Sequence, residues 1–189
     1  QDTIDSIVVA AQVVNNLQSV VSRELRPFDD VVLTIGEFVG GSTGNVIPDK
    51  VRISGTVRRF RSNAELKMPG RMERIVHGVT TAYGAGYSLN YHEGYSPLIN
   101  DGPVTEKVGS VMRGLYGTDR VVQAGPLMTS EDFSSYSSRV PGTFYFIGMK
   151  DEGRPDTYPH HHPLFDIEED VLVDGVRIFT NLVAELMNE

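Results

Sequence analysis

The sequence predicts an α/β protein built from two parts, and three observations predict it. Helical and strand-like periods alternate along the chain, and in the first part their order is α-β-β-α-β. A stretch rich in proline and glycine, residues 97–103, separates the two parts. The chain has 189 residues, enough for two small hydrophobic cores. We therefore expect one domain at 1–96 and a second at 97–189.

The first element is a helix over residues 4–23. Its apolar side chains recur at intervals of three and four residues, and Pro27 ends the pattern. Asp2 or Thr3 is the expected N-cap.

Two strands, a helix and a third strand complete the first part. Residues 31–35 are rich in β-branched side chains, and residues 50–60 alternate apolar with polar ones. Helical spacing returns over 63–83, and residues 87–95 alternate again. This order is that of a split βαβ sandwich whose first strand would precede Gln1.

The second part also alternates. It predicts a helix at 104–116, a short strand at 120–123, a short helix opening at 130–133, a buried-type strand at 143–148 and a closing helix at 168–187. Seven residues form the apolar stripe of the closing helix: Val171, Leu172, Val176, Phe179, Leu182, Val183 and Leu186.

Composition excludes several classes of protein. The net charge is −8 and no basic block occurs, so we expect no nucleic-acid partner. No apolar run approaches the ~20 residues of a membrane span, and the absence of cysteine fits a cytoplasmic protein. The chain starts without Met and leads directly into a helix, so we expect it to be part of a longer protein.

The most informative motif is P-H-H-H-P-L-F-D, residues 159–166. Imidazole is the commonest metal ligand among side chains, and the flanking prolines stiffen the loop. In an extended segment His160 and His162 share one face and His161 points away, so the row alone selects none of them. A solvated loop without ligands is the alternative interpretation.

A second motif lies between the two first strands. Asn45 follows a glycine loop, where its amide could face a ligand, and Arg58 lies 13 positions later on the next strand. A guanidinium can bind a carboxylate through two parallel hydrogen bonds. Taken alone, Asn45 could equally be a turn residue and Arg58 a solvated one.

Five motifs in order carry a family resemblance: G-G-x-x-x-N-V-I-P-D, G-T-x-R, S-E-D-F-S, P-G-x-F-Y-F-I-G and H-H-P-x-F-D. Together they resemble the M20 metallopeptidases, and within them the amidohydrolase branch of N-acyl-amino-acid amidohydrolases, hippurate hydrolases and auxin-conjugate hydrolases. The resemblance implies a ferredoxin-like (α+β) lid and dimerisation domain, followed by the C-terminal portion of a Zn-peptidase-like α/β catalytic domain. It also implies two divalent metals, drawn from Zn, Mn, Co or Ni, and a homodimer formed through the lid.

The same resemblance assigns residues. It implies His161 as a metal ligand, Asn45 as a group that holds or polarises the substrate, often in the partner's site, and Arg58 as the ligand of the substrate carboxylate. Glu131 lies in the S-E-D-F motif, which the resemblance places close to the metal pocket, and we expect it to bind substrate, with helix capping by Ser130 as the alternative. The remaining metal ligands and the general base are expected in an N-terminal half of the same enzyme that would precede this chain.

The sequence therefore predicts metal-dependent hydrolysis of the amide bond of N-acyl amino acids, with this chain a partial enzyme that is inactive alone. Two alternatives remain open. One is a non-catalytic dimerisation or binding module derived from the family. The other is a simple metal-binding domain that uses His160 and His162.

Overall fold

The computed structural model describes residues 2–150, 153 and 157–187, which form two compact units. Unit 1 comprises Gln1–Pro97 together with Leu127–Glu131, and unit 2 comprises Leu98–Pro126 and Asp132–Glu189. Which unit serves as lid and which belongs to a catalytic domain stays a prediction.

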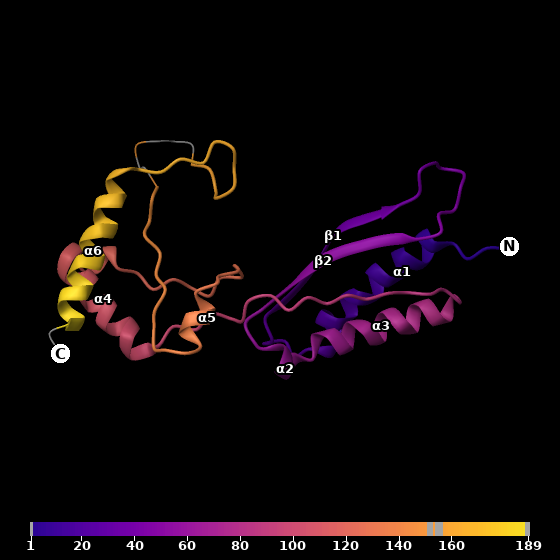
Figure 1. The fold of residues 1–189 in the computed structure, drawn as a ribbon, viewed down its shortest axis with the longest axis horizontal. Helices are drawn as coiled ribbons and strands as arrows, with labels where there is room; N and C mark the ends of the chain where they lie inside the picture. The colour runs from indigo at the N-terminus through magenta and orange to yellow at the C-terminus, as the bar shows by residue number, and fades with distance from the viewer. Residues whose placement is uncertain (1, 151–152, 154–156, 188–189) are drawn as a thin grey trace. The chain divides into compact units, whose positions relative to one another are not determined.

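Unit 1 begins with α1 (Ser6–Ser19), which continues as a π-helical turn over Val20–Glu24 (Figure 1). Its N-cap is Asp5, whose carboxylate accepts hydrogen bonds from the amides of Ile7 and Val8 at 3.0 and 3.1 Å. The expected caps Asp2 and Thr3 were therefore wrong, because the helix begins one turn later.

The hairpin of β1 (Val31–Gly40) and β2 (Val51–Arg59) is antiparallel. A bulge between Ile35 and Glu37 leaves Gly36 unpaired. Because side chains alternate along a strand, the extra residue exchanges the two faces of β1 at that point. The sequence predicted a strand over 31–35, and β1 continues for five more residues, to Gly40. The alternation of apolar and polar residues changes at the bulge, so the sequence pattern ended there.

Two helices follow, α2 (Asn63–Leu66) and α3 (Met68–Ala82), where the sequence predicted one. The break is Lys67, whose φ of 53° is left-handed, and Pro69 stands in the first turn of α3. A proline is accepted at a helix start but interrupts a helix interior.

The core of unit 1 lies between one face of the hairpin and the helices α1 and α3 (Figure 1). Met68 and Val20 are fully buried there. The buried cluster is Val13, Leu17, Val20, Val31, Leu33, Leu66, Met68 and Val76.

The third strand predicted at 87–95 is wrong, since among the described residues the sheet has only the order β1-β2. Side-chain contacts bind this segment instead. The ring of Tyr87 lies edge-on to His77 on α3, with centroids 5.9 Å apart, and Arg59 forms an ion pair with Glu93. Tyr87 therefore packs on a helix rather than in a strand ladder.

Unit 2 contains α4 (Gly102–Tyr116), the 3-10 turn η2 (Thr118–Arg120), α5 (Ser134–Ser137) and α6 (Asp170–Met187). Its core is small: Val108, Ile178 and Leu182 are buried, with Tyr145 and Ile147 packed beside them.

The strands predicted at 120–123 and 143–148 are both wrong, because the part of unit 2 that the structure describes contains no strand. At 143–148 the side chain of Asn100 takes the place of a neighbouring strand. Its amide donates to the carbonyl of Phe144 and accepts from the N–H of Phe144, each at 2.8 Å. A buried-type sequence thus runs extended without a ladder.

Candidate functional site

Asn45 lies in the loop that joins β1 to β2, and its side chain is exposed. Gly41 opens the loop with a φ of 79°, which favours glycine. The other side of the loop is fastened where the hydroxyl of Ser6 donates to the carbonyl of Pro48 at 2.6 Å. The loop therefore presents an amide at one end of the hairpin.

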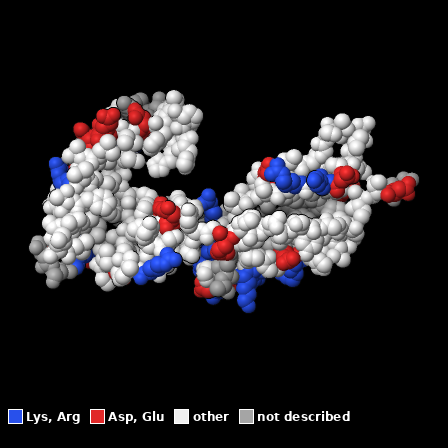
Figure 2. All heavy atoms as spheres, in the orientation of Figure 1, with Lys and Arg blue, Asp and Glu red and all other residues white. Residues whose placement is uncertain are grey.

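Arg58 lies near the other end of β2, opposite Val32, on the exposed face of the hairpin. Its Nη1 donates to the carbonyl oxygen of Met128 at 2.9 Å. Figure 2 shows cationic and anionic groups next to each other over the strands of unit 1. One such pair is Arg52 and Glu37, at 2.6 Å. Hydrogen bonds from Ser54 and Arg52 hold the pKa of the Glu37 carboxyl below its usual value.

Gly55, in the G-T-x-R motif, is required by the bulge. A Cβ built on Gly55 would lie 2.1 Å from the carbonyl oxygen of Thr34. Only glycine allows the strands to approach this closely. The first residue of the motif, Gly55, is therefore needed for the close approach of the two strands. This approach keeps β2 in register with β1 up to Arg58.

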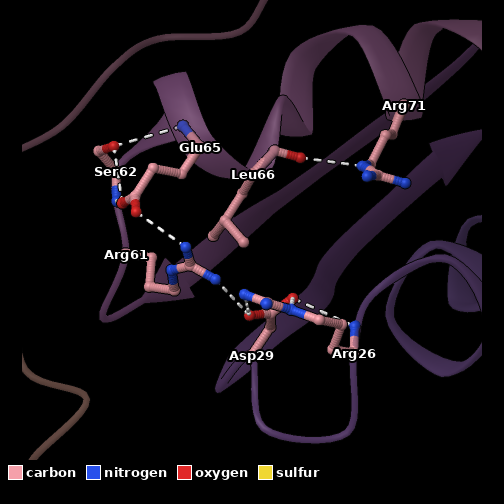
Figure 3. Close-up of polar contacts among 7 residues, drawn as sticks. All are labelled: Arg26, Asp29, Arg61, Ser62, Glu65, Leu66 and Arg71. Carbon is pink, nitrogen blue, oxygen red and sulfur yellow. Dashed lines mark hydrogen bonds and ion pairs between the residues drawn. The ribbon is translucent and has the colours of Figure 1, made fainter.

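A polar cluster fixes the turn that follows β2 (Figure 3). Arg61 donates to Asp29 at 2.7 Å and to Glu65 at 2.8 Å, and Arg26 also donates to Asp29, at 3.0 Å. The Glu65 carboxylate accepts from the N–H of Ser62 at 3.2 Å, as in a capping box. The hydrogen bonds that Glu65 accepts, first the one from Arg61 and then those from Ser62, lower the pKa of the Glu65 carboxyl.

Glu131 is half-buried and ends the segment Leu127–Glu131 of unit 1. The short helix after it begins at Ser134, and its N-cap position is Phe133. The alternative role of Ser130 as a helix cap is therefore wrong, because the helix starts four residues later.

The histidine loop belongs to unit 2. The ring of His160 lies edge-on to Phe165 with centroids 4.9 Å apart, and the ring of His162 stacks on Tyr158 at 4.3 Å. The Nδ1 of His162 also accepts the N–H of Leu164 at 3.1 Å. Neighbouring side chains thus engage both outer rings.

His161 differs from its two neighbours in its backbone. Its φ is 69°, the left-handed conformation, which non-glycine residues seldom adopt. Such strain is found most often at sites where function requires it. The row alone selected no histidine, and the role of His161 as a metal ligand stays a prediction.

The described residues do not complete a metal site. No group of three or more His, Cys, Asp or Glu side chains among them could hold an ion. A catalytic zinc site takes about three protein ligands. His161 is therefore not part of a complete ligand group among these residues.

Arg58 contacts Met128, which lies in the same segment, Leu127–Glu131, as Glu131. Asn45 lies in the loop before β2, whereas Arg58 lies near the end of β2. From Val51 to Arg58 the strand rises about 23 Å at ~3.3 Å per residue. The Met128 carbonyl is a functional candidate that sequence reasoning missed, since a backbone group leaves no signal in a sequence.

Comparisons with known proteins cover most of the chain. The model of peptidase family M20/M25/M40 matches residues 5–185. IAA-amino acid hydrolase ILR1-like 4 of Arabidopsis thaliana is 33% identical over 100% of this chain and 44% of its own length. N-acetyl-L-cysteine deacetylase of Bacillus subtilis is 34% identical over 89% of this chain and 39% of its own.

A solved structure extends the likeness to the fold. The YXEP protein of Bacillus subtilis, described as a dinuclear metal-binding peptidase of the M20 family, has a TM-score of 0.76 and 28% identity over 98% of this chain and 46% of its own. The chain spans less than half the length of these relatives. Among its described residues, no helix is long and apolar enough to cross a membrane.

Proposed function

The chain belongs to peptidase family M20/M25/M40, and we propose that it is the substrate-positioning part of a metal-dependent enzyme that hydrolyses the amide bond of N-acyl amino acids. The observation that carries the proposal is the family match over residues 5–185, together with relatives named as a hydrolase and a deacetylase of amino-acid amides. The overall α/β fold agrees with a solved member of the family.

The role proposed for unit 1 is that of a ferredoxin-like lid. Arg58 binds the substrate carboxylate, because an exposed guanidinium on a rigid strand offers paired donors. Asn45 donates its amide to the carbonyl of the scissile bond, and Glu131 lines the same region. Positioning of this kind lowers the barrier by fixing the reacting groups before reaction.

The distance along β2 supports a homodimer. A substrate the size of an N-acyl amino acid does not span the ~23 Å that β2 rises from Val51 to Arg58. If both residues act on one substrate, Asn45 comes from one copy and Arg58 from another. In this proposal the copies pair along the β1 edge at Val31–Ile35, which has no second partner strand among the described residues.

For unit 2 we propose that His161 ligates one of two divalent metals, with Zn, Mn, Co and Ni as candidates. When bound, such metals polarise a carbonyl and activate water. The other ligands and the general base come from an N-terminal half of the same enzyme. In this proposal the chain contributes one ligand, so no catalytic step is assigned to this chain by itself.

The test is a set of variants in the whole enzyme. His161→Ala should remove metal and reduce turnover by more than the ~10–100-fold that loss of an outer-sphere partner costs. His92→Ala, an exposed histidine of unit 1, is the matched control. Normal metal content and turnover in His161→Ala would refute the assignment. Loss of metal in a His160→Ala, His162→Ala double variant, with metal retained in His161→Ala, would favour the simple metal-binding domain.

The carboxylate assignment has its own test. Arg58→Ala should lower kcat/KM for an N-acyl amino acid about 10- to 150-fold, as expected for a charged hydrogen bond. The corresponding amide without a free carboxylate should lose much less. Equal losses on both substrates would contradict the proposed contact.

The non-catalytic dimerisation or binding module derived from the family is the second candidate. A whole protein that purifies as a dimer without metal or hydrolase activity would establish it.

A further inference from the structure

The hydrogen bond from Arg58 to Met128 joins residues 70 positions apart. The segment that receives it, Leu127–Glu131, is counted with unit 1, whereas the residues on either side of the segment belong to unit 2. A hydrogen bond from a charged donor is roughly twice as strong as a neutral one. Arg58 therefore helps to hold this segment on β2.

The bond leaves most of the guanidinium available. Arginine has five N–H donors, and the bond to Met128 takes one, on Nη1. The edge formed by Nε and Nη2 keeps two parallel N–H groups, the arrangement that binds a carboxylate bidentately. One side chain can thus contact the Met128 carbonyl and a carboxylate at once.

We propose that Arg58 is also a positioning residue: it docks Leu127–Glu131 on β2 through the Met128 carbonyl, and a carboxylate bound at its other edge tightens the docking. The second part rests on the proposed function, because the carboxylate is that of the substrate. The docked carbonyl orients the guanidinium before the ligand arrives, so less conformational freedom is lost on binding. By reciprocity the ligand stabilises the docked segment.

The consequence concerns Glu131, the last residue of the docked segment. When a carboxylate ligand binds Arg58, the position of Glu131 becomes fixed relative to the same guanidinium. An amide ligand without a carboxylate does not produce this effect. Discrimination for free carboxylates would then act through the placement of Glu131 as well as through binding.

The test uses amide NMR and hydrogen exchange on the whole chain. The reporter is the N–H of Thr129, which shares a peptide group with the Met128 carbonyl. Arg58→Met removes the donor and should shift the Thr129 signal and speed exchange in Leu127–Glu131 several-fold. Arg52→Met is the matched control: an arginine on the same face of β2 that pairs with Glu37 instead.

Ligand addition tests the coupling. N-acetylglycine should slow exchange in Leu127–Glu131 by about 2- to 10-fold in the unsubstituted chain, and N-acetylglycinamide should have no effect. Arg58→Lys keeps the charge but lacks the two-donor edge, so it should lose the response to N-acetylglycine.

Two results would overturn the proposal. One is a Thr129 signal that Arg58→Met leaves unchanged, which means that no docking occurs. The other is an N-acetylglycine effect that is absent or accelerates exchange, the latter because the carboxylate displaces the carbonyl. Neither the Arg58→Met experiment nor the N-acetylglycine experiment measures turnover. An inactive whole enzyme with the expected Thr129 and N-acetylglycine responses would therefore contradict only the proposed hydrolysis.

Discussion

Units 1 and 2 both contain amphipathic helices, but they differ in what covers the apolar faces. In unit 1 the hairpin and two helices enclose eight buried side chains. Among the described residues of unit 2, three apolar side chains are buried, while Leu172, Val176 and Phe179 on α6 are at least 60% exposed. The same periodicity thus indicates which residues seek burial without indicating what covers them.

The largest expected effect compares a buried side chain of unit 1 with an exposed one of unit 2. Met68→Ala should lower the free energy of unfolding by about 2–5 kcal/mol, because the side chain is fully buried and leaves a cavity. Leu172→Ala, on the exposed face of α6, should change it by less than about 0.5 kcal/mol. Chemical denaturation of the two variants measures both values.

A large loss in Leu172→Ala would break the comparison. It would show that the face of α6 is covered in solution, by another copy or by chain beyond the described residues. Repeating the measurement at several protein concentrations separates these cases, since only association between copies depends on concentration.

The second prediction concerns the hairpin itself. Gly55→Ala should destabilise unit 1 by about 1–3 kcal/mol, since the added methyl group would overlap the Thr34 carbonyl. Gly36→Ala is the matched control on the neighbouring strand, because a Cβ there meets nothing within 4 Å. Thermal unfolding compares the two variants. Equal stability would mean that the strands separate at the bulge without cost.

The sequence predicts the elements of unit 1 better than the extended segments of unit 2. The helices and the hairpin of unit 1 were predicted because each carries a local period that its own neighbours satisfy. The extended segment 143–148 was mistaken for a strand because its composition is that of one, whereas its hydrogen bonds go to the side chain of Asn100. Composition cannot distinguish a strand partner from an amide that imitates one.

The candidate site divides in the same way. His161, Asn45, Arg58 and Glu131 came from motifs, and their roles stay predictions. Neither the left-handed backbone of His161 nor the Met128 contact could be predicted, because both depend on packing that no local pattern encodes.

The smallest expected effect is a pH dependence confined to unit 1. Glu24 accepts hydrogen bonds from Arg74 at 2.5 Å and from Arg71 at 3.2 Å. These bonds, Arg74 first, hold the pKa of the Glu24 carboxyl below its usual 4.5. A carboxyl whose folded-state pKa is lowered stabilises the fold above its unfolded-state pKa, and this contribution is lost as the pH falls through the folded-state value.

Glu24→Gln should therefore cost stability at pH 7 and progressively less as the pH falls below about 4.5. Denaturant midpoints of both proteins between pH 7 and pH 3 measure the difference. Because the pair joins the π-helical turn to α3, the effect should appear in probes of unit 1, such as exchange of α3 amides, and not in those of α6. A difference that stays constant with pH would mean that Glu24 acts through packing rather than charge.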